Sequence, residues 1–419
     1  MAEYRNRFIE KIIEKKLRSC GAVVIEGPKF CGKTTTAMRY AKSFIKLNTL
    51  RTIELAGIET GNVLLGDTPR VIDEWQTVPE IWNEVKNRID ENPEFGQFIL
   101  TGSSTPADKT KIYHSGAGRI TAVKMKPMSL AESNDSSCTV SLSELATNPD
   151  ISIFHENREA NLRKIAHCIC RGGWPLSVVA GEDIALDVTQ NYYEGLFNFE
   201  YCDNEKFRNK NPEILRLILR SYARNISTEA PVKTILADVN GANNRSVDIK
   251  TMEEYLDALR DLFIIEDIPA WNPNLRSKAA VRTTPTRHFV DTSIAAAVLG
   301  ITPDDLMNDL NTLGLFFEDM AVRDLGIYSS CIGATVKHYR DSNGLECDSV
   351  IHFDNGKWAA IEIKLGGDRL IEEGAANLNR LEKTVDGGTL LFKMILTATG
   401  PSYRRPDGVL VVSIANLTA

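Results

Sequence analysis

A glycine-rich loop near the N-terminus constrains the fold more than any other feature of the sequence. Residues 27–34 read Gly-Pro-Lys-Phe-Cys-Gly-Lys-Thr, between an apolar strand-like segment, 22–26, and a helical pattern over 37–44. A strand, such a loop and a helix in this order predict a Walker A loop, which binds phosphate through its backbone N–H groups. Lys33 would reach the outer phosphates, and the Thr34 hydroxyl could bind Mg²⁺. The predicted nucleotide contacts are Gly27, Pro28, Lys29, Phe30, Cys31, Gly32, Lys33, Thr34 and Thr35.

Two further strand-like segments carry polar residues at their ends. Segment 70–74 ends in Asp73, which would hold the Mg²⁺ ion, and in Glu74, which would polarise the water that attacks the γ-phosphate. Segment 97–100 precedes Thr101, whose hydroxyl could sense the γ-phosphate, although such residues also form ordinary turns. We therefore expect ATP and Mg²⁺ as cofactors and ATP hydrolysis as the reaction.

Arg119 ends a glycine-rich segment, 114–119. An arginine there could neutralise charge in the transition state, either in its own subunit or in a neighbouring subunit of a homo-oligomer. An arginine that only fixes its own loop fits the sequence equally well.

Four segments, 24–27, 67–76, 99–103 and 114–119, together resemble a widespread prokaryotic family of AAA-type P-loop ATPases fused to a C-terminal domain of unknown function. The likeness runs over nearly the whole chain, and its motifs are most specific in the N-terminal third. The resemblance implies an N-terminal parallel sheet of the AAA type that binds and hydrolyses ATP.

The composition is that of a globular chain with several domains. The 419 residues are 43% hydrophobic and 25% charged. The net charge of −7 argues against a general polyanion binder, and eight cysteines without paired CxxC spacing favour reduced thiols over a zinc site. No apolar run approaches the roughly 18 residues of a membrane span, and the N-terminal stretch is charged, so we expect no membrane contact and a cytoplasmic location.

The middle of the chain predicts a winged-helix-like module. Three helical patterns, at 214–219, 232–237 and 252–262, precede two strand-like segments at 263–267 and 287–290. Between Trp271 and Val290 the cations are not accompanied by any acid, and a local basic loop of this kind fits contact with a DNA backbone. These cations are Arg276, Lys278, Arg282 and Arg287. A lid or spacer with a solvated basic loop is the open alternative.

The C-terminal third carries a pattern of acids and one lysine. Glu318 lies in an apolar helical stretch, Asp348 lies on a first predicted strand, and Glu362-x-Lys364 lies on the next. This pattern resembles the PD-(D/E)xK nuclease superfamily. The resemblance implies that Asp348 and Glu362 hold a divalent ion, that Lys364 orients or deprotonates water, and that Glu318 supports the site.

The turn between these two strands decides whether their acids can meet. A two-residue Asn-Gly turn would place Asp348 opposite Ile363, on the wrong face of the hairpin. A three-residue turn over 354–356, with Gly356 in the left-handed conformation, would place Asp348 opposite Glu362. We therefore predict the three-residue turn.

A polar stretch over 133–150 predicts a domain boundary in a multidomain α/β chain. The expected domains are a P-loop ATPase domain over 1–135, a linker and helical segment over 136–205, a winged-helix-like domain over 206–300 and a mixed α/β, restriction-endonuclease-like domain over 301–419. The leading hypothesis is an ATPase whose nucleotide state controls a nucleic-acid-binding, nuclease-like half. The competing hypothesis is a regulatory ATPase that binds DNA or a protein partner through a catalytically inactive C-terminal domain.

Overall fold

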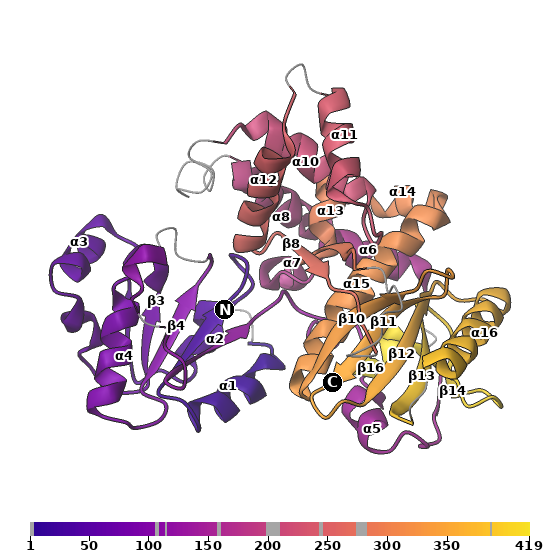
Figure 1. Cartoon of the computed structure of the whole chain (residues 1–419), viewed down its shortest axis with the longest axis horizontal. Helices are drawn as coiled ribbons and strands as arrows, with labels where there is room; N and C mark the ends of the chain where they lie inside the picture. Colours follow the sequence, from indigo (N-terminus) through magenta and orange to yellow (C-terminus); the bar gives the residue numbers. More distant parts are fainter. Residues whose placement is uncertain are drawn as a thin grey trace.

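The computed structural model describes residues 4–104, 109–113, 115–156, 161–197, 210–242, 246–273, 283–385 and 388–419. Figure 1 shows an N-terminal α/β region, a helical region and a C-terminal α/β region, with the long helix α15 (Leu310–Cys331) where they meet. No helix in the described part of the chain is long and apolar enough to cross a membrane.

The N-terminal region is built on a five-stranded sheet in the order β2-β3-β4-β1-β5, and all of its strand pairs are parallel. The central strands are runs of buried Val, Ile and Leu, as expected for a parallel sheet covered on both faces. Its strands are β1 (Ala22–Glu26), β2 (Ser43–Lys46), β3 (Arg70–Asp73), β4 (Phe98–Gly102) and β5 (Ile120–Lys124). The surrounding helices are α1 (Ile9–Leu17), α2 (Lys33–Met38), α3 (Leu50–Ile58) and α4 (Ile81–Glu91). This sheet confirms the predicted parallel α/β fold.

Strand register gathers the predicted nucleotide residues at one edge of this sheet. Glu26, at the end of β1, lies opposite Gly102 of β4, and Asp73, at the end of β3, lies opposite Thr101. The P-loop that follows β1 therefore shares an edge with the polar ends of β3 and β4.

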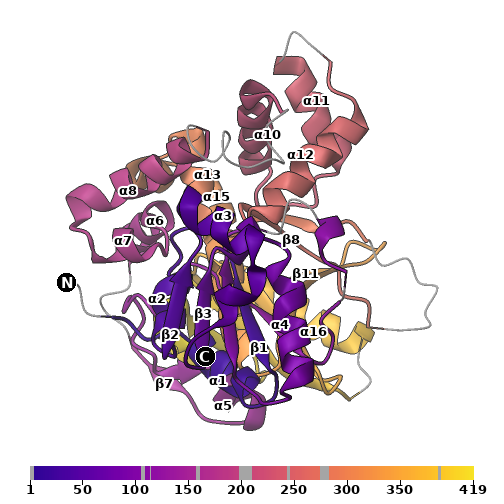
Figure 2. The same ribbon diagram turned by 90° about the vertical axis from the view of Figure 1, so that its left-hand side faces the viewer.

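The helical region contains two groups of helices. Helices α6, α7 and α8 lie together with α13 in Figure 2, and α6 also packs against α14. Helices α10, α11 and α12 precede an antiparallel strand pair, β8 with β9, in the order expected of the winged-helix-like module. The helices are α6 (Leu162–Arg171), α7 (Pro175–Val179), α8 (Glu182–Gly195), α10 (Pro212–Arg224), α11 (Val232–Ala242), α12 (Ile249–Asp261), α13 (Thr292–Leu299) and α14 (Pro303–Asn308). The strands are β8 (Ile265–Ile268) and β9 (Thr286–Phe289).

The C-terminal region is a mixed seven-stranded sheet in the order β10-β11-β12-β13-β15-β14-β7. Side chains alternate across β11, so Val350 packs with the core under α16 whereas Ile351 packs with the core under α15. The two helices therefore cover opposite faces of the sheet. Its further elements are β10 (Ala334–Arg340), β11 (Glu346–Phe353), β12 (Trp358–Lys364), α16 (Asp368–Val385), β13 (Leu390–Thr397), β14 (Ser402–Arg404) and β15 (Leu410–Ser413).

The segment predicted to be an interdomain linker belongs largely to the C-terminal region. Strand β6 (Val140–Ser141) pairs with β16 (Leu417–Thr418), and β7 (Phe154–His155) extends the C-terminal sheet beside β14. Helix α5 (Leu142–Thr147) also contacts β13. The residues after the boundary expected at 135–136 therefore pack with the C-terminal region and do not form a free linker. Strands of two residues are too short for the sequence pattern to have indicated this pairing.

Candidate functional site

The P-loop adopts a conformation that depends on its glycines. A Cβ atom on Gly27 would overlap Met125 O, and Gly32 has φ 103°, a left-handed value that glycine adopts without strain. Helix α2 begins directly after Gly32, with its first N–H groups at the loop. The Lys33 ammonium is buried and donates to Gly27 O at 2.9 Å and to Pro28 O at 2.8 Å. The loop thus holds its own lysine where phosphate oxygens would bind.

Two hydroxyl groups converge on the carboxylate of Asp73. Thr34 Oγ1 donates to Asp73 Oδ1 at 2.8 Å, and Thr101 Oγ1 donates to the same oxygen. Asp73 is buried, with 7% of its surface exposed. Carboxylate and hydroxyl oxygens are hard ligands of the kind that Mg²⁺ prefers, so these residues fit a magnesium ion beside the P-loop.

Glu74 follows Asp73 in a left-handed conformation, with φ 60°, which turns the chain sharply after β3. Its carboxylate accepts hydrogen bonds from Gln76 Nε2 at 2.5 Å and from Ser103 Oγ at 3.2 Å. The sequence indicated neither contact: Gln76 meets Glu74 within the turn after β3, and Ser103 meets it because β3 and β4 end side by side. Together they fix the side chain expected to orient water.

The structure does not bring Arg119 to this edge. Arg119 precedes β5, and its carbonyl accepts from the N–H of Ala22, the first residue of β1, so it lies at the opposite end of the strands from the P-loop. Its guanidinium pairs with Asp90 at 2.8 Å and is about half exposed. A role for Arg119 in the site of its own subunit is therefore wrong, because strand direction separates the two; a role in a neighbouring subunit stays a prediction.

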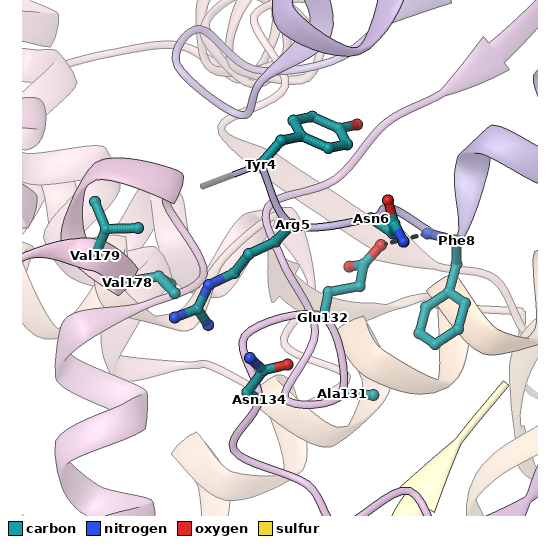
Figure 3. Close-up of a pocket in the computed structure, with 9 residues that line it drawn as sticks. All are labelled: Tyr4, Arg5, Asn6, Phe8, Ala131, Glu132, Asn134, Val178 and Val179. Atoms are coloured by element: carbon teal, nitrogen blue, oxygen red, sulfur yellow. Dashed lines mark hydrogen bonds between the residues drawn. The ribbon is translucent and has the colours of Figure 1, made fainter. Parts of the chain in front are cut away.

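A pocket of about 600 Å³ lies beside the P-loop, between the N-terminal segment and α7 (Figure 3). Its walls touch the phosphate-binding elements on two sides. Tyr4 OH lies 3.0 Å from Thr36 Oγ1 of α2, and Pro175, the first residue of α7, would contact a Cβ on Gly32. The lining includes Tyr4, Asn6, Phe8, Asn134, Val178 and Val179. Beside these aromatic, aliphatic and amide groups, which suit a planar heterocycle, the lining carries the charged Arg5 and Glu132.

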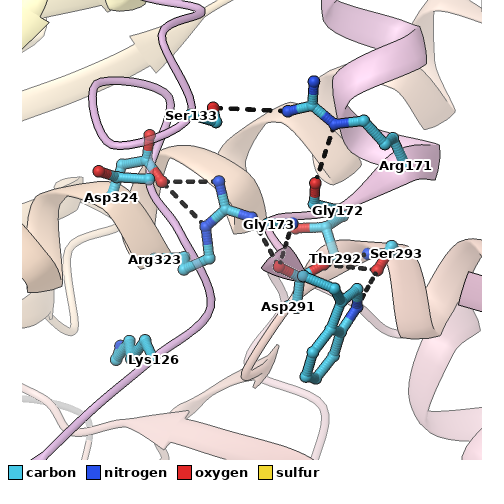
Figure 4. Close-up of polar contacts among 12 residues, drawn as sticks. Lys126, Ser133, Arg171, Gly172, Gly173, Asp291, Thr292, Ser293, Arg323 and Asp324 are labelled. Atoms are coloured by element: carbon cyan, nitrogen blue, oxygen red, sulfur yellow. Dashed lines mark hydrogen bonds and ion pairs between the residues drawn. The ribbon is translucent and has the colours of Figure 1, made fainter. Parts of the chain in front are cut away.

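A buried polar junction joins all three regions (Figure 4). Asp291 Oδ2 accepts from Gly173 N at 2.9 Å and from Arg323 Nη1 at 2.7 Å. Arg323 also pairs with Asp324, whose second oxygen accepts from Leu130 N at 2.8 Å. Burial disfavours the charged guanidinium, but Asp324 and Asp291 raise the pKa of Arg323 above its usual value, so the guanidinium stays charged.

The hairpin of the C-terminal sheet has the register predicted from its turn. Ser349 lies opposite Ile361, and the same register places Asp348 opposite Glu362. The connection is the three-residue turn over 354–356, closed by Phe353 N to Lys357 O at 2.9 Å, with Gly356 at φ 81°. The predicted turn is therefore confirmed.

The acids of this hairpin share one ammonium group. Lys364 Nζ lies 3.0 Å from Asp348 Oδ2 and 2.8 Å from Glu362 Oε2. Asn377 of α16, which the sequence did not single out, donates to Glu362 Oε1 at 2.8 Å. Burial and the Asp348 carboxylate raise the pKa of Glu362 to about 8, and the pKa of Lys364 is also raised because both acids outweigh its burial.

The expected metal ion does not fit this arrangement directly. The Lys364 ammonium takes the position between Asp348 and Glu362 that a cation would need, and Glu318 approaches from α15, on the other side of the sheet. Burial, and then the Asp348 carboxylate, raise the pKa of Glu318 well above its ordinary value. Among the described residues, no group of three or more His, Cys, Asp or Glu side chains could hold a metal ion.

Only one of the four cations predicted for the basic loop lies within the described residues, and it is buried. Arg287 is buried, pairs with Asp267 at 2.9 Å and donates from Nε to Ala230 O at 2.9 Å, so it cannot contact phosphate. The third helix, α12, exposes Glu253, Glu254 and Asp257, whereas α10 exposes Arg220 and Arg224. The other predicted cations of this loop, Arg276, Lys278 and Arg282, lie outside the described residues.

Comparisons with known proteins divide the chain into three parts. Residues 20–134 match the family model of an AAA domain, residues 162–305 match a domain of unknown function (DUF8612), and residues 313–417 match a second domain of unknown function (DUF4143). No curated protein matches the chain. The second match begins at α6 and ends within α14, in agreement with the packing of α6 and α8 against α13. The strand order and the phosphate loop of the N-terminal region agree with its match to the AAA domain model.

Proposed function

We propose that the protein hydrolyses ATP at the P-loop and that its nucleotide state controls the C-terminal half, which acts on nucleic acid. The convergence of Thr34 and Thr101 on Asp73, beside Lys33, carries the first part of this proposal. These groups come from β3, β4 and the loop after β1, and a parallel sheet has no structural need to collect such polar groups at one edge.

Each residue of the N-terminal site has a role in this reaction. The loop N–H groups bind the phosphates, and Lys33 exchanges the carbonyls of Gly27 and Pro28 for phosphate oxygens. When bound at Thr34 and Asp73, Mg²⁺ supplies positive charge that neutralises the phosphates. Glu74, fixed by Gln76, orients the attacking water.

The base of the nucleotide would occupy the pocket between the N-terminal segment and α7. The pocket volume of about 600 Å³ is ample for a purine. Because Tyr4 contacts Thr36 in α2, the helix that follows the P-loop, a nucleotide with its phosphates at Lys33 could extend its base toward Tyr4 and Val179.

The second part of the proposal rests on the hairpin of the C-terminal half, which places Asp348 opposite Glu362. Its order of elements, a helix, three antiparallel strands, a helix and a strand, resembles the nuclease superfamily implied by the sequence pattern. In this arrangement Lys364 would stabilise negative charge on a phosphate while Asn377 holds Glu362 in place.

The second candidate is a regulatory ATPase with an inactive C-terminal domain, binding DNA or a protein. One specific observation favours it: the ammonium of Lys364 lies 3.0 Å from Asp348 Oδ2 and 2.8 Å from Glu362 Oε2, as in a structural cluster of charged side chains. Catalysis would require Lys364 to release at least one of these carboxylates to a substrate or an ion.

Cleavage of DNA by the full chain separates the two candidates. Single-stranded and double-stranded DNA would be incubated with Mg²⁺ or Mn²⁺, with and without ATP, using the native chain, Lys33→Ala, Glu362→Gln and the exposed control Glu373→Gln. The nuclease proposal predicts cleavage that Glu362→Gln abolishes, Lys33→Ala alters and Glu373→Gln leaves unchanged. ATP hydrolysis without cleavage would establish the regulatory ATPase.

A further inference from the structure

Arg7, in the segment before α1, joins the P-loop to the chain that leaves the N-terminal sheet. Its Nη1 donates to Cys31 O of the loop at 2.8 Å, and its Nη2 donates to Lys126 O at 2.7 Å. The residue is 5% exposed, and its Nε lies 3.1 Å from Glu132 Oε1 in an ion pair. A guanidinium is rigid and planar, so a shift of one of these carbonyls moves or strains the contact with the other.

The carbonyl that Arg7 holds lies in the part of the loop that must respond to phosphate. Cys31 O belongs to the peptide that enters Gly32, where φ is 103°, one residue before Lys33. The Lys33 ammonium donates hydrogen bonds to two carbonyls of the loop. Binding of phosphate would draw the ammonium away from these carbonyls and turn N–H groups of the loop toward the phosphate. The Cys31 peptide would reorient with them, and Arg7 would report this change.

On its other side, Arg7 contacts a segment that is bonded to α15. Glu132 Oε2 accepts from Ser129 N at 2.9 Å, which fixes the turn that Glu132 shares with Leu130. Leu130 N then donates to Asp324 Oδ2 at 2.8 Å, and Ala131 N donates to Tyr328 OH at 3.3 Å. Figure 4 shows Asp324 together with Arg323 at this junction.

Helix α15 extends the same connection into the C-terminal half. Asp324 and Tyr328 lie on the helix that also carries Glu318, whose carboxyl interacts electrostatically with Asp348 of the hairpin site. Arg7 also connects to the helical region through Lys126, whose ammonium pairs with Glu266 of β8 at 2.5 Å. The contacts of one arginine therefore lead from the P-loop to both of the other regions.

We propose that Arg7 is a positioning residue that transmits the phosphate-bound state of the P-loop to α15. This inference rests on the proposed binding of ATP and names the route by which nucleotide would act on the C-terminal half. A structural role alone would require Arg7 for folding but would give α15 no dependence on nucleotide.

Hydrogen exchange of α15 tests this route in the full chain. The native chain, Arg7→Lys and the exposed control Arg18→Lys would be compared with and without a non-hydrolysable ATP analogue, whose binding is measured in parallel. We expect the analogue to change the exchange rates of α15 amides by at least about fivefold in the native chain and in Arg18→Lys. In Arg7→Lys, which keeps the charge but reaches one carbonyl at a time, the analogue should bind while this change is lost.

The opposing outcomes are distinct. An α15 response of native size in Arg7→Lys, loss of analogue binding in that variant, or no response in a native chain that binds the analogue would overturn the proposed role. A native chain that does not bind the analogue would instead refute the proposed ATP site. If Arg7→Lys does not fold, Asp324→Asn provides the second test, because its amide cannot accept from both Leu130 N and Arg323; a normal α15 response there would also overturn the route.

Discussion

The hydroxyl of Thr34 donates a 2.8 Å hydrogen bond to Asp73 Oδ1, which joins the start of helix α2 to the end of strand β3. This contact places the two predicted magnesium ligands side by side although they are 39 residues apart. It also makes the magnesium dependence of the N-terminal site testable through Asp73.

Replacing Asp73 with asparagine should separate nucleotide binding from hydrolysis. The amide keeps the size of the side chain but loses the charge that holds Mg²⁺, so phosphate release should fall by at least about 100-fold. Binding of ATP without metal should change little, as measured by fluorescence of a labelled nucleotide. Asp187→Asn, at an exposed position of α8, is the matched control. Hydrolysis at the native rate by Asp73→Asn would show that Asp73 does not hold the magnesium ion.

Filling the pocket beside the P-loop should weaken the binding of ATP but not the binding of a phosphate chain alone. In Val179→Trp the indole would occupy the space assigned to the base, so the affinity for ATP should fall by about tenfold or more, or about 1.4 kcal/mol. Inorganic tripolyphosphate, used as a competitor, should bind as to the native chain. Leu176→Trp, on the same helix but 62% exposed and outside the lining, is the control. Equal loss of both ligands would contradict the assignment.

Adding one methyl group at Gly173 should loosen the three-way junction. A Cβ there would overlap Met128 O, whose backbone forms a 2.6 Å hydrogen bond from Met128 N to Gly173 O. Gly173→Ala should therefore lower the free energy of unfolding by about 1–3 kcal/mol, measured by chemical denaturation. Gly241→Ala is the matched control because no atom lies within 4 Å of its added Cβ. Similar stabilities for the two variants would show that the junction can adapt.

The raised pKa of Glu362 gives the stability of the native chain a defined pH dependence. Because its pKa is about 8 when folded and near the ordinary 4.5 when unfolded, the folded chain binds more protons between these values. Stability should therefore fall as pH rises from about 5 to about 8, by at most about 1.4 kcal/mol per unit. Glu362→Gln removes this titration, so its stability relative to the native chain should increase over the same range. A difference that does not vary with pH would contradict the burial of Glu362 beside the Asp348 carboxylate.

Local patterns in the sequence were sufficient for the P-loop and for the C-terminal hairpin. The loop conformation depends on Gly27 and Gly32, and a strand before it and a helix after it leave few alternatives. The register of Asp348 against Glu362 follows from counting residues across a three-residue turn, because side chains alternate with a period of two.

Features that depend on distant segments could not be predicted in this way. Arg119 looked suitable for catalysis, but the direction of β5 places it at the far end of the sheet. Arg287 looked like part of a basic loop, but Asp267 neutralises it in the interior. Arg7 and Asn377 carry no motif, and only the assembled fold shows what they contact.

ATP hydrolysis by the full chain with and without Glu74→Gln tests the central claim most directly. The glutamine keeps the position next to Asp73 but cannot polarise water as a carboxylate does, so phosphate release should fall by at least about 100-fold. ATP should still bind to this variant with native affinity. A native chain that releases no phosphate, or a Glu74→Gln variant that releases it at the native rate, would contradict the assignment of this edge of the sheet as an ATPase site.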